Sequence, residues 1–110
     1  MKIKSALAAF ALVLAAGTAA QAQQPAISSA WGNMRLSDNE CFALAQRVFE
    51  RLRFTRIERV GNSVFADSGN YQFAFRCVSE KGMFYVYGGG PDSRPLDRQI
   101  DELREEFLNR

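Results

Sequence analysis

Hydrophobic residues recur at helical spacing in two segments of the chain. In the first, the apolar side chains fall within one arc at the ~100° per residue of an α-helix; they are Cys41, Leu44, Ala45, Val48, Phe49 and Leu52. Ser37 and Glu40 form a capping-box pattern just before it, which predicts a helix over residues 38–53. The second segment carries an i, i+4, i+7, i+11 stripe of Leu96, Ile100, Leu103 and Phe107. It predicts a closing helix that Asp92 or Ser93 caps.

Between these helices the pattern changes to the alternation that is typical of strands. Residues 71–78 alternate between one face with Tyr71, Phe73, Phe75 and Cys77, and another with Gln72, Ala74, Arg76 and Val78. Residues 83–87 form a further strand, and residues 54–66 indicate a strand with a bulge, or two short strands around Gly61 and Asn62. The order predicts an α+β fold: a helix, a three-stranded antiparallel meander and a helix, with both helices on one sheet face.

The register of the hairpin over residues 71–87 depends on the turn at residues 79–82. A type I turn with a bulge at Gly82 pairs Ser79 with Met83 and leaves Phe84 outside the core. A turn with even spacing puts Phe84 into the core and Tyr85 opposite Arg76. The sequence does not choose between them.

The chain begins like a secretory signal peptide. A basic start with Lys2 and Lys4 precedes an apolar run over residues 6–16, which is too short to span a bilayer, and an Ala-Gln-Ala cleavage pattern ends at Ala22. We therefore expect a signal peptide over residues 1–22, a linker over 23–36 and a single domain over 37–110. The expected location is periplasmic or secreted, with no stable membrane insertion after cleavage.

Charge argues against a nucleic-acid partner. The chain has 14 basic and 12 acidic residues, a formal net charge of +2. Lys2 and Lys4 account for that excess, so the part that follows the predicted signal peptide is neutral. Phosphate backbones are bound by proteins with an excess of Lys and Arg.

The two cysteines predict a structural disulfide. Cys41 lies at the centre of the apolar helix face, and Cys77 shares a strand face with Phe73 and Phe75. Both thiols therefore point to the same core, and exported chains with two cysteines usually pair them. The spacing is not that of a C-x-x-C redox motif, and two cysteines without histidine make a poor metal site.

These motifs together carry a resemblance. Cys41 in a first helix, a strand that starts at Tyr71 and ends in Arg76-Cys77, and a strand that runs into a Gly-Gly-Pro turn before a closing helix resemble small exported bacterial proteins with no assigned activity. The resemblance implies export, this fold and the disulfide. It implies no catalytic residues.

The sheet face that the helices leave uncovered is the first candidate site. It gives a candidate partner face made of Ala74, Arg76, Val78, Phe84 and Tyr85. Apolar surface of this kind often marks an interaction site, so we expect a binding or accessory module that acts through protein–protein contact or self-association. The alternative is that Ile27, Trp31 and Met34 from the predicted linker cover this face.

A glycine-rich turn is the second candidate. Gly88, Gly89 and Gly90 lie between a strand and a helix start at Ser93. Backbone N–H groups at such a place can hold an anion, so a small-ligand or anion-binding domain is the alternative function. The turn lacks the Lys and Ser/Thr of a phosphate-binding loop.

Catalysis has little support in the composition. The chain contains no histidine, which removes the usual general base and most metal sites. A hydrolase that uses carboxylates alone ranks last, because no acid–base pair is placed credibly. We expect no catalytic residues, no metal and no cofactor.

Overall fold

The computed structural model describes residues 24–109. The predicted signal peptide lies outside them. The elements in chain order are β1 (Ala26–Asn33), α2 (Asp38–Arg51), β2 (Thr55–Val60), β3 (Ser63–Ser68), β4 (Tyr71–Val78), the short 3-10 helix η1 (Ser79–Lys81), β5 (Met83–Gly90) and α3 (Ser93–Leu108). The strands form one antiparallel five-stranded sheet in the order β1-β5-β4-β3-β2. The class is α+β, but the prediction of a three-stranded meander is wrong.

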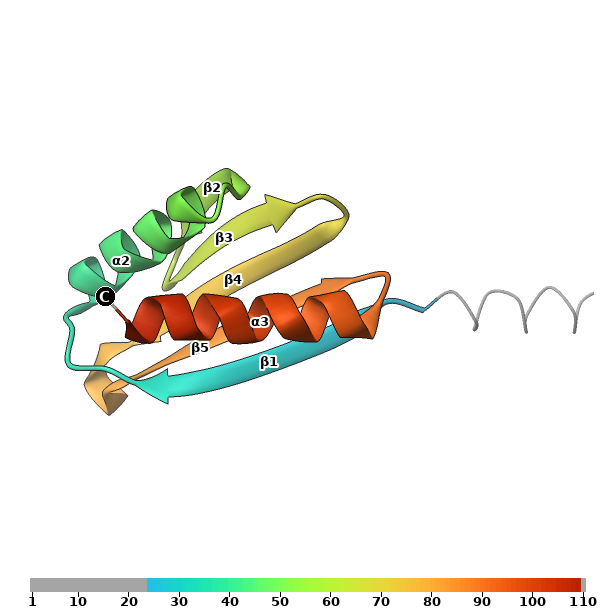
Figure 1. The fold of residues 1–110 in the computed structure, drawn as a ribbon. Coiled ribbons are helices and arrows are strands. Elements are labelled where there is room, and N and C mark those ends of the chain that lie inside the picture. Colours follow the sequence, from blue (N-terminus) through green and yellow to red (C-terminus); the bar gives the residue numbers. More distant parts are fainter. Residues whose placement is uncertain (1–23, 110) are drawn as a thin grey trace, which may run out of the picture.

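One additional strand is β1, which the sequence analysis placed in a linker. It pairs with β5 along its whole length, from Ala26 opposite Gly90 to Asn33 opposite Met83. In Figure 1 it lies at the edge of the sheet, beside α3. Residues 26–33 therefore belong to the domain rather than to a linker.

The other additional strand comes from splitting residues 54–66 in two. Val60 pairs with Ser63 across a tight turn, and Gly61 takes a left-handed backbone with φ 61°. This is the two-strand alternative that the Gly61-Asn62 pair indicated. The register also shifts between Thr55 and Glu58, where Arg56 has φ 51°, so β2 is irregular at the sheet edge.

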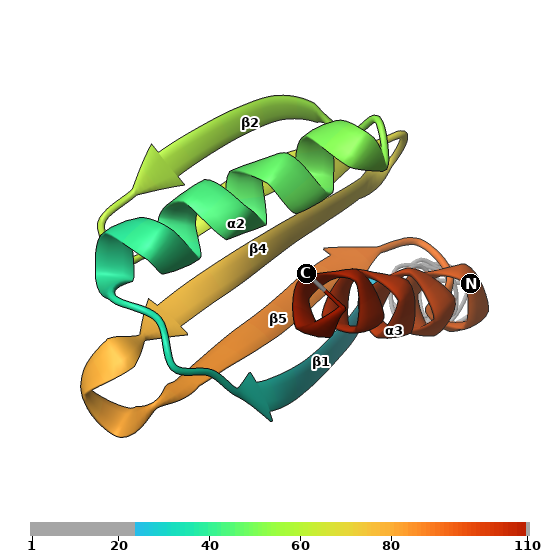
Figure 2. The same ribbon diagram turned by 60° about the vertical axis from the view of Figure 1, so that its left-hand side comes forward.

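Both helices lie on the same face of the sheet (Figures 1 and 2). The predicted capping box is confirmed: the Glu40 amide donates to the Ser37 hydroxyl at 3.2 Å, and the Ser37 amide donates to the Glu40 carboxylate at 3.0 Å. The predicted stripe of α3 is confirmed as well, since its four apolar side chains are all buried. Asp92 is the N-cap of α3, but its side chain makes no capping hydrogen bond.

The core between helices and sheet is rich in phenylalanine. The Phe107 ring lies 4.1 Å from that of Phe84 and 5.1 Å from that of Phe75, measured between centroids. The predicted disulfide between Cys41 and Cys77 is present, and it joins α2 to β4 within this core. Aromatic pairs add about 0.5–1.5 kcal/mol each to the effect of burial.

The β4–β5 hairpin settles the register that the sequence left open. Val78 pairs with Met83, and Arg76 lies opposite Tyr85. The turn between them is η1, closed by Gly82 in the left-handed region at φ 64°. Phe84 and Val86 therefore face the core.

Candidate interaction surface

The sheet has one face that no described element covers, which we call the open face. Large hydrophobic side chains with high exposure in residues 24–109 are Ile27 (86%), Val60 (56%), Trp31 (53%) and Tyr85 (39%). Strand alternation places all of them on the open face, because their strand neighbours turn toward the helices or the core. The exposed apolar surface of the domain is thus gathered on one side.

Two aromatic side chains and one basic side chain lie in a row across β1, β5 and β4 on the open face. Trp31 of β1 pairs with Tyr85 of β5, and Tyr85 pairs with Arg76 of β4. Directly opposed side chains of this kind lie close enough to contact one another. The Tyr85 hydroxyl also lies 3.9 Å from the Met83 sulfur.

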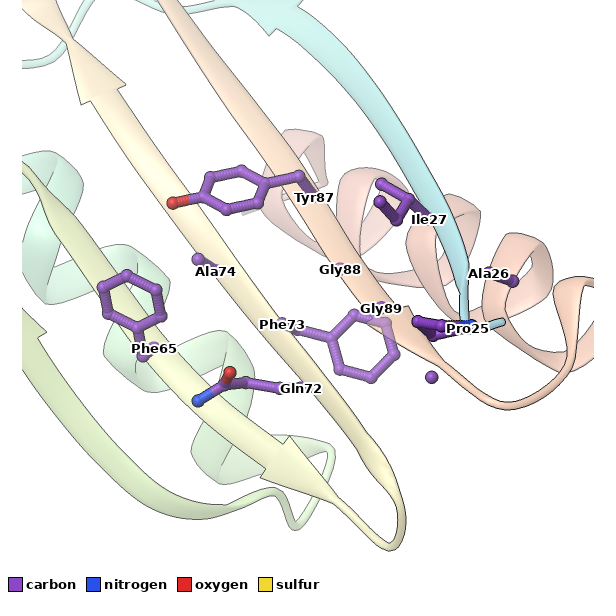
Figure 3. Close-up of a pocket in the computed structure, with 11 residues that line it drawn as sticks. Pro25, Ala26, Ile27, Phe65, Gln72, Phe73, Ala74, Tyr87, Gly88 and Gly89 are labelled. Atoms are coloured by element: carbon purple, nitrogen blue, oxygen red, sulfur yellow. The ribbon is translucent and has the colours of Figure 1, made fainter. Parts of the chain in front are cut away.

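A shallow pocket of about 310 Å³ lies next to this row (Figure 3). Ala74 forms its middle, with Phe65 of β3 and Tyr87 of β5 as the cross-strand neighbours on either side. Gly89 has no side chain to fill the space beyond, and Gln72 supplies an amide at the rim. The pocket is suited to a single apolar group with one hydrogen-bonding partner nearby.

Charged residues surround the apolar part of the open face on the β2 side. Arg56 and Asp67 form an ion pair at 3.2 Å, and Glu58 is exposed beside Phe65. An apolar centre with a polar rim is the usual composition of a protein–protein interface.

The predicted partner face is brought together with one exception. Arg76, Val78 and Tyr85 belong to the open face by strand alternation, and Ala74 lies on the same face but is only 1% exposed. Phe84 does not: it is fully buried on the opposite side, in contact with Phe107. The physical reason is the even spacing of the turn, which pairs Val78 with Met83 and sends Phe84 inward.

The predicted cover is also not present in the described residues. Ile27 and Trp31 extend the open face instead of lying across it, because β1 continues the sheet. Met34 is buried in the core. Sequence reasoning named Ile27 and Trp31 only as a cover and did not place Val60 on this face; the alternation of Ile27, Ser29 and Trp31 is the signal that identifies β1.

The candidate ligand turn is not a turn. Gly88, Gly89 and Gly90 are the last residues of β5 and pair with residues of β1, and Ser93 is the first residue of α3. Gly88 and Gly89 also pair with Phe73 and Gln72 of β4. Sheet pairing engages the backbone of Gly88 and Gly89 on both sides and that of Gly90 on the β1 side, so these glycines do not form the cradle of free N–H groups that an anion needs.

Three further findings bear on the type of site. Within residues 24–109, no cluster of three or more His, Cys, Asp or Glu side chains is arranged to hold a metal ion. No helix in the same range is long and apolar enough to cross a membrane. No family model matches the chain, and no curated protein matches it significantly.

Proposed function

We propose that this protein is a small exported module that binds a protein partner through its open face. The observation that carries the proposal is the gathering of Ile27, Trp31, Val60 and Tyr85 on the one sheet face without a helix. Large apolar side chains that are exposed together on one face of a domain often mark an interaction site.

The chemistry of the patch favours a protein as the partner. Tyrosine, tryptophan and arginine are the residues that most often dominate binding energy in protein interfaces, and Trp31, Tyr85 and Arg76 stand side by side here. The pocket between Phe65 and Tyr87 offers a place for one anchoring side chain of the partner. The near-neutral chain gives no electrostatic support for a polyanion.

Two features are consistent with an exported protein. The Cys41–Cys77 disulfide is of the kind that forms in the periplasm or outside the cell and is rare in the cytosol. The leader-like pattern of residues 1–22 agrees with that location.

The test is affinity capture from a periplasmic extract with the disulfide-bonded protein as bait. Tyr85→Glu and Val78→Glu place a charge on the open face, and Gln46→Glu adds the same charge at an exposed site on α2. A stoichiometric protein that the native bait and Gln46→Glu retain, and that both open-face variants lose, supports the proposal. A protein that all baits retain equally, or no retained protein at all, contradicts it.

A further inference from the structure

The two edges of the sheet differ in how they are protected. β2 carries Arg56, Glu58 and Arg59, has a register shift and is irregular at Arg56. Such charges and bulges are the devices that prevent an edge strand from pairing with another chain. β1 has eight residues, none of them charged and none proline, and it pairs with β5 without a shift. The β1 edge is therefore open to strand addition.

The backbone of β1 presents free groups at that edge. The Met34 amide donates to the Gly82 carbonyl at 2.9 Å, so the backbone N–H and C=O groups of the even-numbered residues point toward β5. The Trp31 carbonyl points the other way, because it accepts a hydrogen bond from Arg104 Nε at 2.7 Å. By the alternation of an antiparallel ladder, the backbone groups of Ile27 and Ser29 share the direction of Trp31.

Helix α3 lies alongside this edge and runs in the same direction as β1 (Figure 1). Asp101 and Arg104, three residues apart, line a groove with the last residues of β1, Ala30, Trp31, Gly32 and Asn33. The core-facing residues Leu96, Ile100, Leu103 and Phe107 lie on a different side of the helix. Asp101 and Arg104 therefore face the space in which an added strand and its helix would sit.

We propose that the occupant of this edge is a second copy of the same chain. A two-fold axis near Ala30 pairs β1 with β1 of the second copy in antiparallel fashion, and it places the two α3 helices side by side in opposite directions. Asp101 of each copy then meets Arg104 of the other. The contact forms twice, because a two-fold interface is self-complementary.

This charge arrangement favours a second copy over an unrelated peptide. When a second copy of α3 lies alongside in the opposite direction, the acid of each helix lies opposite the base of the other. In the dimer Arg104 exchanges its hydrogen bond to the Trp31 carbonyl and its 3.5 Å ion pair with Glu105 for the Asp101 carboxylate of the second copy. The added strand then donates to the Trp31 carbonyl. The dimer goes beyond the proposed function, since it uses the β1 edge and joins two open faces into one larger surface.

The experiment is sedimentation equilibrium of the purified, disulfide-bonded protein over a range of concentrations. We expect the native chain to reach twice the monomer mass. Asp101→Arg and Arg104→Asp should each be monomeric at the same concentrations, because each sets like charges against each other. An equimolar mixture of the two variants should recover the doubled mass, since every contact is then between opposite charges.

Two further variants separate this arrangement from a folding defect. Arg47→Asp makes the same charge change as Arg104→Asp at an exposed site on α2, and it should leave the dimer intact. Ser29→Pro removes an edge N–H without touching the β5 ladder, and it should abolish the dimer while the circular dichroism stays native. A native chain that is monomeric at its highest soluble concentration overturns the proposal. So does a dimer that survives either single charge reversal or Ser29→Pro, or a mixture of the reversed variants that stays monomeric.

Discussion

Gly88 and Gly89 are adjacent in β5, and the structure predicts different outcomes when each is replaced by alanine. A Cβ atom at Gly88 would lie 2.6 Å from Cδ1 of Phe73 and 2.8 Å from the Gln72 carbonyl oxygen. Both atoms belong to β4, and Phe73 is 1% exposed, so neither can move away freely. A Cβ at Gly89 would meet its nearest atom, the Ala26 carbonyl oxygen, at 3.3 Å.

The size of the difference follows from these distances. Neither glycine has a positive φ, so alanine brings no backbone strain at either position. Both replacements reduce the freedom of the unfolded chain and stabilise the fold by about 0.4–1 kcal/mol. Overpacking costs roughly 1–3 kcal/mol, and the short contacts with β4 place that cost chiefly at Gly88. We expect Gly88→Ala to be less stable than Gly89→Ala by about 1–3 kcal/mol.

Urea unfolding of the two variants with the disulfide intact measures this difference directly. The unfolded-state term is shared and cancels when the two are compared. In a domain of this size each kcal/mol also changes the melting temperature by roughly 4–8 °C, which thermal unfolding can resolve. Equal midpoints for the two variants would refute the assignment of the glycines to a close-packed strand and would return them to a flexible turn.

Three other replacements test separate parts of the fold. Replacing both Cys41 and Cys77 by alanine removes a link across a sequence separation of 36 residues, which should lower the free energy of unfolding by about 4 kcal/mol; unchanged urea midpoints would argue against a structural role. Ser37→Ala should cost about 1 kcal/mol because it removes the cap of α2, whereas Asn39→Ala in the same exposed turn should cost less, and equal losses would contradict the capping assignment. Phe107→Ala should cost about 3–5 kcal/mol in urea unfolding because its ring is fully buried among other rings; a loss below 1 kcal/mol would not fit that packing.

Local signals in the sequence were enough to predict both helices and β4. The capping pair of Ser37 and Glu40 lies within one turn of α2, and the apolar stripe of α3 needs no other part of the chain to be recognised. The strict alternation around Phe73 and Phe75 likewise belongs to a single strand. Each of these patterns is complete within its own element.

β1 was missed because its core-facing positions lack the large apolar side chains that usually reveal a strand. On its core side it carries small residues, and at Gly32 a Cβ atom would lie 2.7 Å from the Phe84 ring. Gly88 is a second example: β5 has a glycine there because the Phe73 ring fills the space that a side chain would need. A segment of small residues therefore resembles a linker or a turn as long as the large side chain that packs against it, far away in the sequence, has not been identified.

The candidate surface was predicted in part for a related reason. Arg76 and Tyr85 could be placed opposite each other in one of the two registers, but the choice depended on the turn. Gly82 and η1 decide it, and they turn Phe84 into the core. Ile27 and Trp31 could not be assigned to the face until β1 was known to pair with β5.

Site-specific photocrosslinking in the producing cells tests the central claim most directly. A photoreactive phenylalanine derivative at position 85 samples the open face one strand in from the β1 edge, and the same group at position 46 samples the exposed side of α2. The open-face account predicts a discrete adduct with another protein from position 85 and none of that mass from position 46. Identical adduct patterns from both positions, or none from position 85, would contradict it.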